Sequence, residues 1–178
     1  MSLWTAVWLV VALVLGWLGS TFTEGRRHRR RAKRAREERL EQRREAHSEH
    51  RRQFELTTLS DSYGALSRLA RAAARVHLLE LTIARTSSTY GGHHIDDDEL
   101  DEEHRLATLE VSRLAGLILD DELRQLVTAA HDAVLSVPMG QKTVAQGEAQ
   151  FNHAFEKVDV AQCACAERIR ELYQSDVA

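Results

Sequence analysis

The hydrophobic pattern of the chain begins with one long apolar run. Residues 3–22, LWTAVWLVVALVLGWLGSTF, include no ionisable side chain over twenty positions. A helix rises about 1.5 Å per residue, so a run of this length matches a bilayer hydrocarbon core of roughly 30 Å. A helix also satisfies its own backbone hydrogen bonds in lipid. The pattern therefore predicts a single N-terminal transmembrane helix, with residues 1–23 as the anchor.

A cleaved secretory signal is the main alternative for this run. Such a signal carries a basic region before its apolar core and small residues at its cleavage site. No Lys or Arg precedes the run, and Leu18 makes the triplet Leu18-Gly19-Ser20 a poor site, although Gly19-Ser20-Thr21 fits better. A buried helix of a soluble domain is a further alternative, which the length disfavours. We therefore favour an uncleaved anchor.

A basic run follows and sets the expected topology. Residues 26–36, RRHRRRAKRAR, hold eight Lys or Arg and no acid. Lys and Arg gather on the cytoplasmic side of a membrane span. The N-terminus is therefore predicted outside the cell membrane and the C-terminal domain in the cytoplasm. The predicted membrane-surface residues are Arg26, Arg27, Arg29, Arg30, Arg31, Lys33, Arg34 and Arg36.

Charge is distributed unevenly between the two parts of the chain. Residues 1–52 hold 13 Lys or Arg and 6 acids, a net charge of +7, whereas residues 53–178 hold 11 and 21, a net charge of −10. Each Lys or Arg near an anionic membrane surface contributes about 1 kcal/mol of attraction. Anionic lipid of the inner leaflet is therefore a predicted partner. The simpler alternative is a basic run that only sets the topology.

The charged segment of residues 24–57 predicts a juxtamembrane helix that is polar on all sides. Leu40, His47 and Phe54 lie seven apart, which is too thin an apolar seam for a coiled coil. Gly64 and the polar cluster just before it are potential break points. The sequence therefore leaves open whether residues 24–90 form one helix or two.

Beyond this segment, apolar residues recur at steps of three and four, the spacing of one helix face. They predict an all-α cytoplasmic domain, residues 58–178, built as an antiparallel bundle of about four helices. On the first helix the stripe comprises Leu59, Tyr63, Leu66, Leu69, Ala73, Val76 and Ile83. The other expected helices are residues 99–118, 120–136 and 143–173, with acids at the starts of the second and third as caps.

The last helix carries the longest unbroken stripe, which we name the seam and predict as an interaction surface. Its mean step of about 3.5 residues suits packing against partner helices. Packing inside its own bundle is favoured over packing against another copy, because the other helices also need cover. The seam comprises Phe151, Phe155, Val158, Ala161, Cys165, Ile169 and Leu172.

Histidines and acids cluster around residues 93–104. Their side chains are of types that bind divalent metals, and Asp101 and His104 share a helix face. The cluster has neither the spacing of an EF-hand loop nor the Glu-x-x-His repeats of di-iron bundles. We therefore predict no metal and no cofactor, and an acidic helix cap instead. The weaker metal alternative would use His93, His94, Asp101 and His104.

A catalytic alternative uses Arg124 and His131. Small all-α ribonucleases of the HEPN type place Arg and His at this spacing, but such pairs occur here about as often as the Arg and His content predicts by chance. No phosphate-binding loop, nucleophile elbow or zinc-protease motif is present in the sequence. The prediction is therefore no enzyme, with a membrane-anchored ribonuclease-like or weakly metal-binding enzyme as the alternative.

The sequence thus predicts a membrane-tethered, non-catalytic helical scaffold or adaptor that presents its bundle at the inner leaflet. Its expected partners are anionic lipid and either another protein or a second copy of the chain. Nucleic acid is disfavoured, because the basic run lacks the interleaved aromatic residues that stack on bases.

Overall fold

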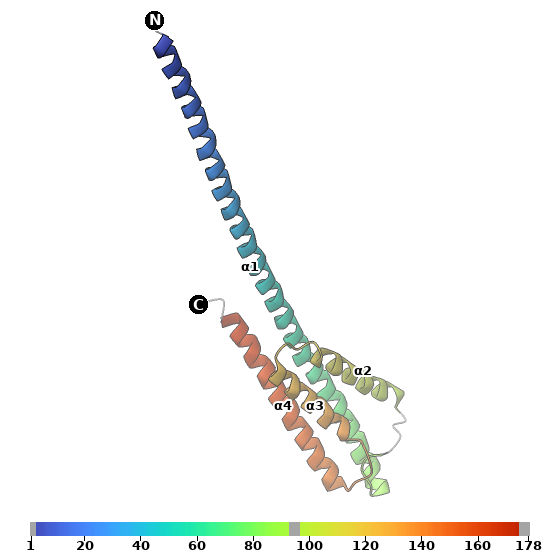
Figure 1. The fold of residues 1–178 in the computed structure, drawn as a ribbon. Coiled ribbons are helices and arrows are strands. Elements are labelled where there is room, and N and C mark those ends of the chain that lie inside the picture. Colours follow the sequence, from blue (N-terminus) through green and yellow to red (C-terminus); the bar gives the residue numbers. More distant parts are fainter. Residues whose placement is uncertain (1–2, 93–96, 175–178) are drawn as a thin grey trace. The chain divides into compact units, whose positions relative to one another are not determined.

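The computed structural model describes residues 3–92 and 97–174, with side chains from residue 36 onward. The described residues form four helices and no strand, apart from an isolated antiparallel bridge between Tyr90 and Lys142. The helices are α1 (Leu3–Ser87), α2 (Asp98–Ala115), α3 (Asp121–Ser136) and α4 (Val144–Gln174) (Figure 1). The all-α prediction is confirmed, and residues 24–87 belong to one helix.

The chain divides into two compact units, residues 1–50 and residues 51–178. In the first unit, every side chain from residue 36 to residue 50 is exposed, as expected of a helix that is polar on all sides. The predicted anchor lies outside the residues whose side chains are described. Of the eight predicted membrane-surface residues, Arg36 alone has a described side chain, and it is exposed. Among the residues whose side chains are described, from residue 36 onward, no helix has the length and apolar character needed to cross a bilayer.

Ion pairs in the second unit show how α1 and α2 pack. Arg68 binds Glu110 with an N–O distance of 2.9 Å, and Arg75 binds Glu103 further along α1. Arg75 follows Arg68 along α1, whereas its partner Glu103 precedes Glu110 along α2. The two helices are therefore antiparallel.

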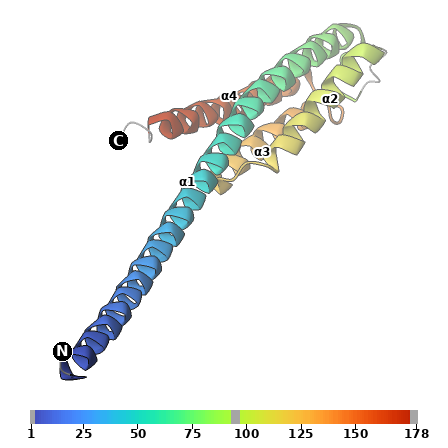
Figure 2. The same cartoon turned by 90° about the horizontal axis from the view of Figure 1, so that it is seen from above.

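The same relation holds between α1 and α4. Glu55 near the start of the unit accepts a hydrogen bond from Arg168, whereas Ser67 accepts one from Gln162. Helix α3 packs on both α2 and α4. The four helices therefore form the antiparallel bundle that the stripes predict (Figures 1 and 2).

Helix starts follow the predicted acidic caps. The Asp97 side chain accepts a hydrogen bond from Leu100 N at 3.0 Å, and Asp120 accepts one from Leu123 N at the same distance. Each carboxylate satisfies an N–H that lacks a partner within its helix.

The inward face of α1 differs from its predicted stripe at Tyr63. This side chain is 43% exposed, while the neighbouring Ser62 is buried. Ser62 tolerates burial because its hydroxyl donates to the carbonyl of Thr58 at 2.7 Å. A small hydroxyl residue thus occupies the face that the tyrosine was expected to fill.

Candidate functional site: a groove between α3 and α4

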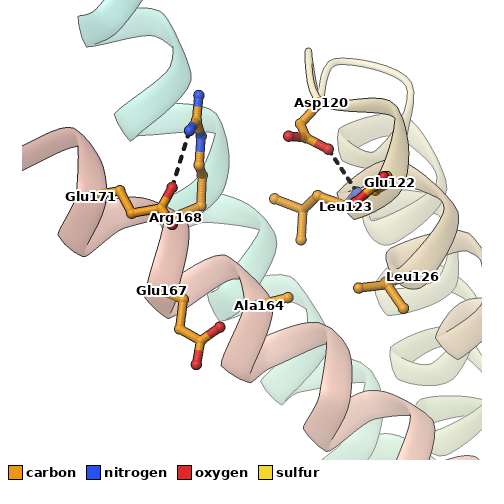
Figure 3. A pocket seen from close by; sticks show the side chains of 8 residues that line it. All are labelled: Asp120, Glu122, Leu123, Leu126, Ala164, Glu167, Arg168 and Glu171. Carbon is orange, nitrogen blue, oxygen red and sulfur yellow. Dashed lines mark hydrogen bonds and ion pairs between the residues drawn. The ribbon is translucent and has the colours of Figure 1, made fainter.

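A hollow of about 180 Å³ lies between the N-terminal part of α3 and the C-terminal part of α4. Figure 3 shows its lining side chains, which come from the two helices and from the cap residue of α3. We call this hollow the acidic groove. Its lining comprises Asp120, Glu122, Leu123, Leu126, Ala164, Glu167, Arg168 and Glu171.

The floor of the groove is apolar and belongs to the core. Leu123 is 5% exposed, and Leu126 and Ala164 are partly buried against the core. Because these side chains are held by packing, the hollow has a fixed apolar base rather than a base of mobile surface side chains.

Arg168 forms part of the wall and is held by two carboxylates. Its Nε donates to Glu55 Oε1 at 2.9 Å, and its Nη1 donates to Glu171 Oε2 at 3.1 Å. The Glu55 hydrogen bond, followed by that to Glu171, raises the pKa of the Arg168 guanidinium above its ordinary value. The groove therefore already holds one guanidinium between acids.

The remaining carboxylates leave the groove with an excess of negative charge. Four carboxylates line it against one guanidinium. Asp120 is engaged as the cap of α3, whereas Glu122 and Glu167 are exposed and make no ion pair with the residues that the structure describes. The groove is thus a cation-attracting hollow with an apolar floor.

A second cluster of interacting side chains, which we name the loop junction, surrounds Tyr90 at the opposite end of the bundle. Tyr90 is fully buried, and its hydroxyl lies 2.6 Å from Nδ1 of His77. The His77 ring stacks on Phe151, with ring centroids 3.9 Å apart. Burial, with a smaller contribution from Glu80, raises the pKa of the Tyr90 phenol to about 12. The phenol therefore stays protonated at physiological pH.

Two charged residues complete the loop junction. Glu80 is 1% exposed and accepts a hydrogen bond from Gly91 N at 3.0 Å. Lys142 donates to Val137 O at 2.8 Å and to Gln150 Oε1 at 2.6 Å. Burial lowers the pKa of Lys142, and the nearby Glu80 opposes that change. These contacts tie the loops that follow α1 and α3 to the bundle.

Arg124 and His131 both belong to α3, and each has its own hydrogen-bond partner. Arg124 Nη1 donates to Ile118 O at 3.1 Å, and the same guanidinium pairs with Asp121. His131 Nδ1 lies 3.0 Å from Asp132. Both side chains are engaged with near neighbours in sequence, and neither lines the acidic groove.

The predicted metal alternative is only partly within the described residues. His93 and His94 lie outside them, Asp101 is exposed and His104 is partly buried. Burial lowers the pKa of His104, with Asp101 opposing. In the part of the chain that is described, no group of three or more potential metal-ligating side chains comes together.

The seam faces the chain's own bundle. Val158, Ala161 and Cys165 are buried. Among the other members, Phe151, Ile169 and Leu172 pack partly buried against the core, and Phe155 contacts the Phe151 ring. Burial raises the pKa of the Cys165 thiol to about 11, which fits a small core side chain. Intramolecular packing therefore covers most of the seam.

Acidification is expected to destabilise the bundle. Burial lowers the pKa of His77, which Glu148 partly opposes, and burial also lowers the pKa of His104. The unfolded chain binds these protons near its ordinary pKa of 6.5, whereas the folded chain binds them only at lower pH. The free energy of unfolding therefore decreases as the pH falls below 6.5, because the unfolded chain takes up protons that the folded chain does not bind.

Urea unfolding at about pH 7.5 and about pH 5.5 measures this loss. We expect a lower midpoint at the acidic pH and a smaller difference in His77→Gln. The matched control is His153→Gln, which alters a histidine whose side chain is 61% exposed. A midpoint that is independent of pH contradicts the prediction.

Comparison with protein-family models, curated proteins and solved structures gives no match.

Proposed function

We propose that the chain is a membrane-tethered, non-catalytic scaffold or adaptor that presents its four-helix bundle at the cytoplasmic face of the membrane. The observation that carries the proposal is the continuity of α1 from Leu3 to Ser87. One helix therefore includes the apolar run, the basic run and the first helix of the bundle. The apolar run supplies the anchor, and the basic run sets the orientation and attracts anionic lipid.

The contacts of the bundle support a binding role over catalysis. Arg124 and His131 hydrogen-bond separate neighbours rather than each other. The acidic groove instead offers carboxylates around an apolar floor, an arrangement suited to recognition of a partner.

Reporter fusions test the topology. A fluorescent protein fused after Ala178 is expected to fluoresce on the cytoplasmic side, whereas alkaline phosphatase at the same position is expected to be inactive. Membranes washed with carbonate are expected to retain the full chain and to lose a variant that lacks residues 3–22. An active phosphatase fusion, or full chain in the soluble fraction, contradicts the proposal.

Vesicle binding tests the role of the basic run. The chain without residues 3–22 is expected to bind vesicles containing phosphatidylserine and to leave them as salt rises. Replacing the eight basic residues by Gln is expected to abolish that binding. If neutral vesicles bind equally well, the basic run does not recognise anionic lipid.

A further inference from the structure

We infer that the acidic groove is a docking site for an arginine- or lysine-bearing helix of a partner protein. The inference rests on the proposed adaptor function and names the chemistry of its partner. Its starting point is a groove in which four carboxylates and one guanidinium surround an apolar floor.

The size of the groove favours a side chain over a small-molecule ligand. Its volume is about 180 Å³. Sites for small molecules usually enclose roughly 300–1,000 Å³. A hollow below that range suits one anchoring side chain of a larger partner, whose remaining contacts would lie on the surrounding helix surface.

Charge complementarity specifies which side chain would anchor the partner. Glu122 on α3 and Glu167 on α4 carry carboxylates without an ion-pair partner among the described residues (Figure 3). Each of these carboxylates can accept from the several N–H donors of a guanidinium or the three of an ammonium group. An acidic or neutral partner would leave both carboxylates uncompensated.

Arg168 shows how this wall accommodates a guanidinium. It is bonded to Glu55 and Glu171 at 2.9 and 3.1 Å, and its side chain is 37% exposed. A partner arginine would make the same kind of charge-assisted contact with the carboxylate oxygens that Arg168 does not occupy.

The apolar floor adds a second requirement. Arg and Lys bury their methylene stems on apolar surface while their charged ends remain in polar surroundings. Leu123, Leu126 and Ala164 supply such a surface below the acidic rim. A partner with apolar residues beside its basic ones therefore fits better than a purely charged tail.

The rim also suggests the spacing of the partner. Glu167 and Glu171 are four residues apart on α4, which is about 6 Å along a helix. Glu171 binds Arg168 through Oε2, so its other carboxylate oxygen is the acceptor that a partner would use. A helix with basic residues at i and i+4 presents charges at the same separation. The inferred partner is therefore an amphipathic helix with paired Arg or Lys residues on one face.

Peptide binding to the full chain tests the inference. The chain is placed in nanodiscs of zwitterionic lipid, so that the lipid does not attract the probe. The probe is a fluorescein-labelled helical peptide with Arg at i and i+4 beside Leu, and its counterpart has Glu in place of Arg. Fluorescence anisotropy is expected to show saturable binding of the Arg peptide and none of the Glu peptide.

Matched variants separate the groove from general electrostatic attraction. Glu122→Gln/Glu167→Gln neutralises the two unpaired groove acids, and Glu156→Gln/Asp159→Gln neutralises two exposed acids of α4 that do not line the groove. The groove variant is expected to weaken binding by about tenfold, whereas the control should bind like the parent chain. Equal weakening in both variants overturns the inference.

A third variant fills the groove instead of neutralising it. Ala164→Arg places a guanidinium of the chain itself on the floor, and we expect it to compete with the probe and abolish binding. Circular dichroism shows whether each variant retains its helices.

The two proposals fail separately. A parent chain of the expected topology that does not bind the Arg peptide overturns the docking site alone. A reporter on the wrong side overturns the membrane topology, whatever the purified chain binds.

Discussion

Tyr90→Ala is expected to lower the free energy of unfolding of the bundle by about 3–5 kcal/mol, the range for truncating a large buried aromatic side chain. Tyr90 is fully buried, and its ring contacts His77 with centroids 5.5 Å apart. Two backbone hydrogen bonds of 2.9 Å to Lys142 hold the residue in place. The surroundings therefore collapse only partly into the cavity, and the cost lies well above that of a surface change.

Urea unfolding of the full chain in detergent, followed by circular dichroism, measures this effect. Two further variants serve for comparison: one removes only the Tyr90 hydroxyl, and the other truncates an exposed tyrosine. Tyr90→Phe keeps the ring but leaves His77 Nδ1 without its hydroxyl partner, so a loss of about 1–3 kcal/mol is expected. Tyr63→Ala removes a tyrosine that is 43% exposed, and a change within about 0.5 kcal/mol is expected. If Tyr90→Ala behaves like Tyr63→Ala, the loop junction does not stabilise the fold.

The helices could be predicted because their signals are local. Caps such as Asp97 and Asp120 stand within three residues of the N–H groups that they bind. The stripe of α4 places Val158 and Cys165 on one face through helix geometry alone. Such features need no knowledge of the rest of the chain.

Tyr90 and Glu80 could not be assigned in the same way, because their partners are distant in sequence. Tyr90 stands in a loop beside two glycines and pairs with Lys142, 52 positions later. Glu80 is a carboxylate within an otherwise apolar stretch, and its burial depends on the N–H of Gly91. In the sequence, Glu80 stands out as an isolated acid and Tyr90 as a lone aromatic residue. Neither signal identifies the group that the residue contacts.

The acidic groove is likewise a product of tertiary structure. Glu122 and Glu167 each lie on the polar side of their own helix, where exposed acids are expected. Only the antiparallel packing of α3 on α4 brings them to one hollow. The sequence predicted an acidic domain but gave no means of locating where its charge is concentrated.

Gly147→Ala is expected to destabilise the bundle, although the same change usually stabilises a helix. Alanine gains up to about 1 kcal/mol over glycine in a helix interior. At Gly147, however, a Cβ would lie 2.4–2.7 Å from three ring atoms of Tyr90, closer than such atoms approach. Tyr90 is fully buried and its backbone is bridged to Lys142, so the ring can shift only by displacing the side chains that enclose it. Overpacking of this kind costs about 1–3 kcal/mol, so the net effect is a loss.

Gly64→Ala is the matched control within α1. The nearest atom to its added Cβ is the flexible tip of Arg68, at an ordinary 3.6 Å. Only the gain in helix propensity remains there, so stability is expected to rise by up to about 1 kcal/mol. One chemical change should therefore have opposite signs at the two glycines in the same urea titration. A gain at both positions would show that the Tyr90 ring can move, which would also reduce the loss expected for Tyr90→Ala.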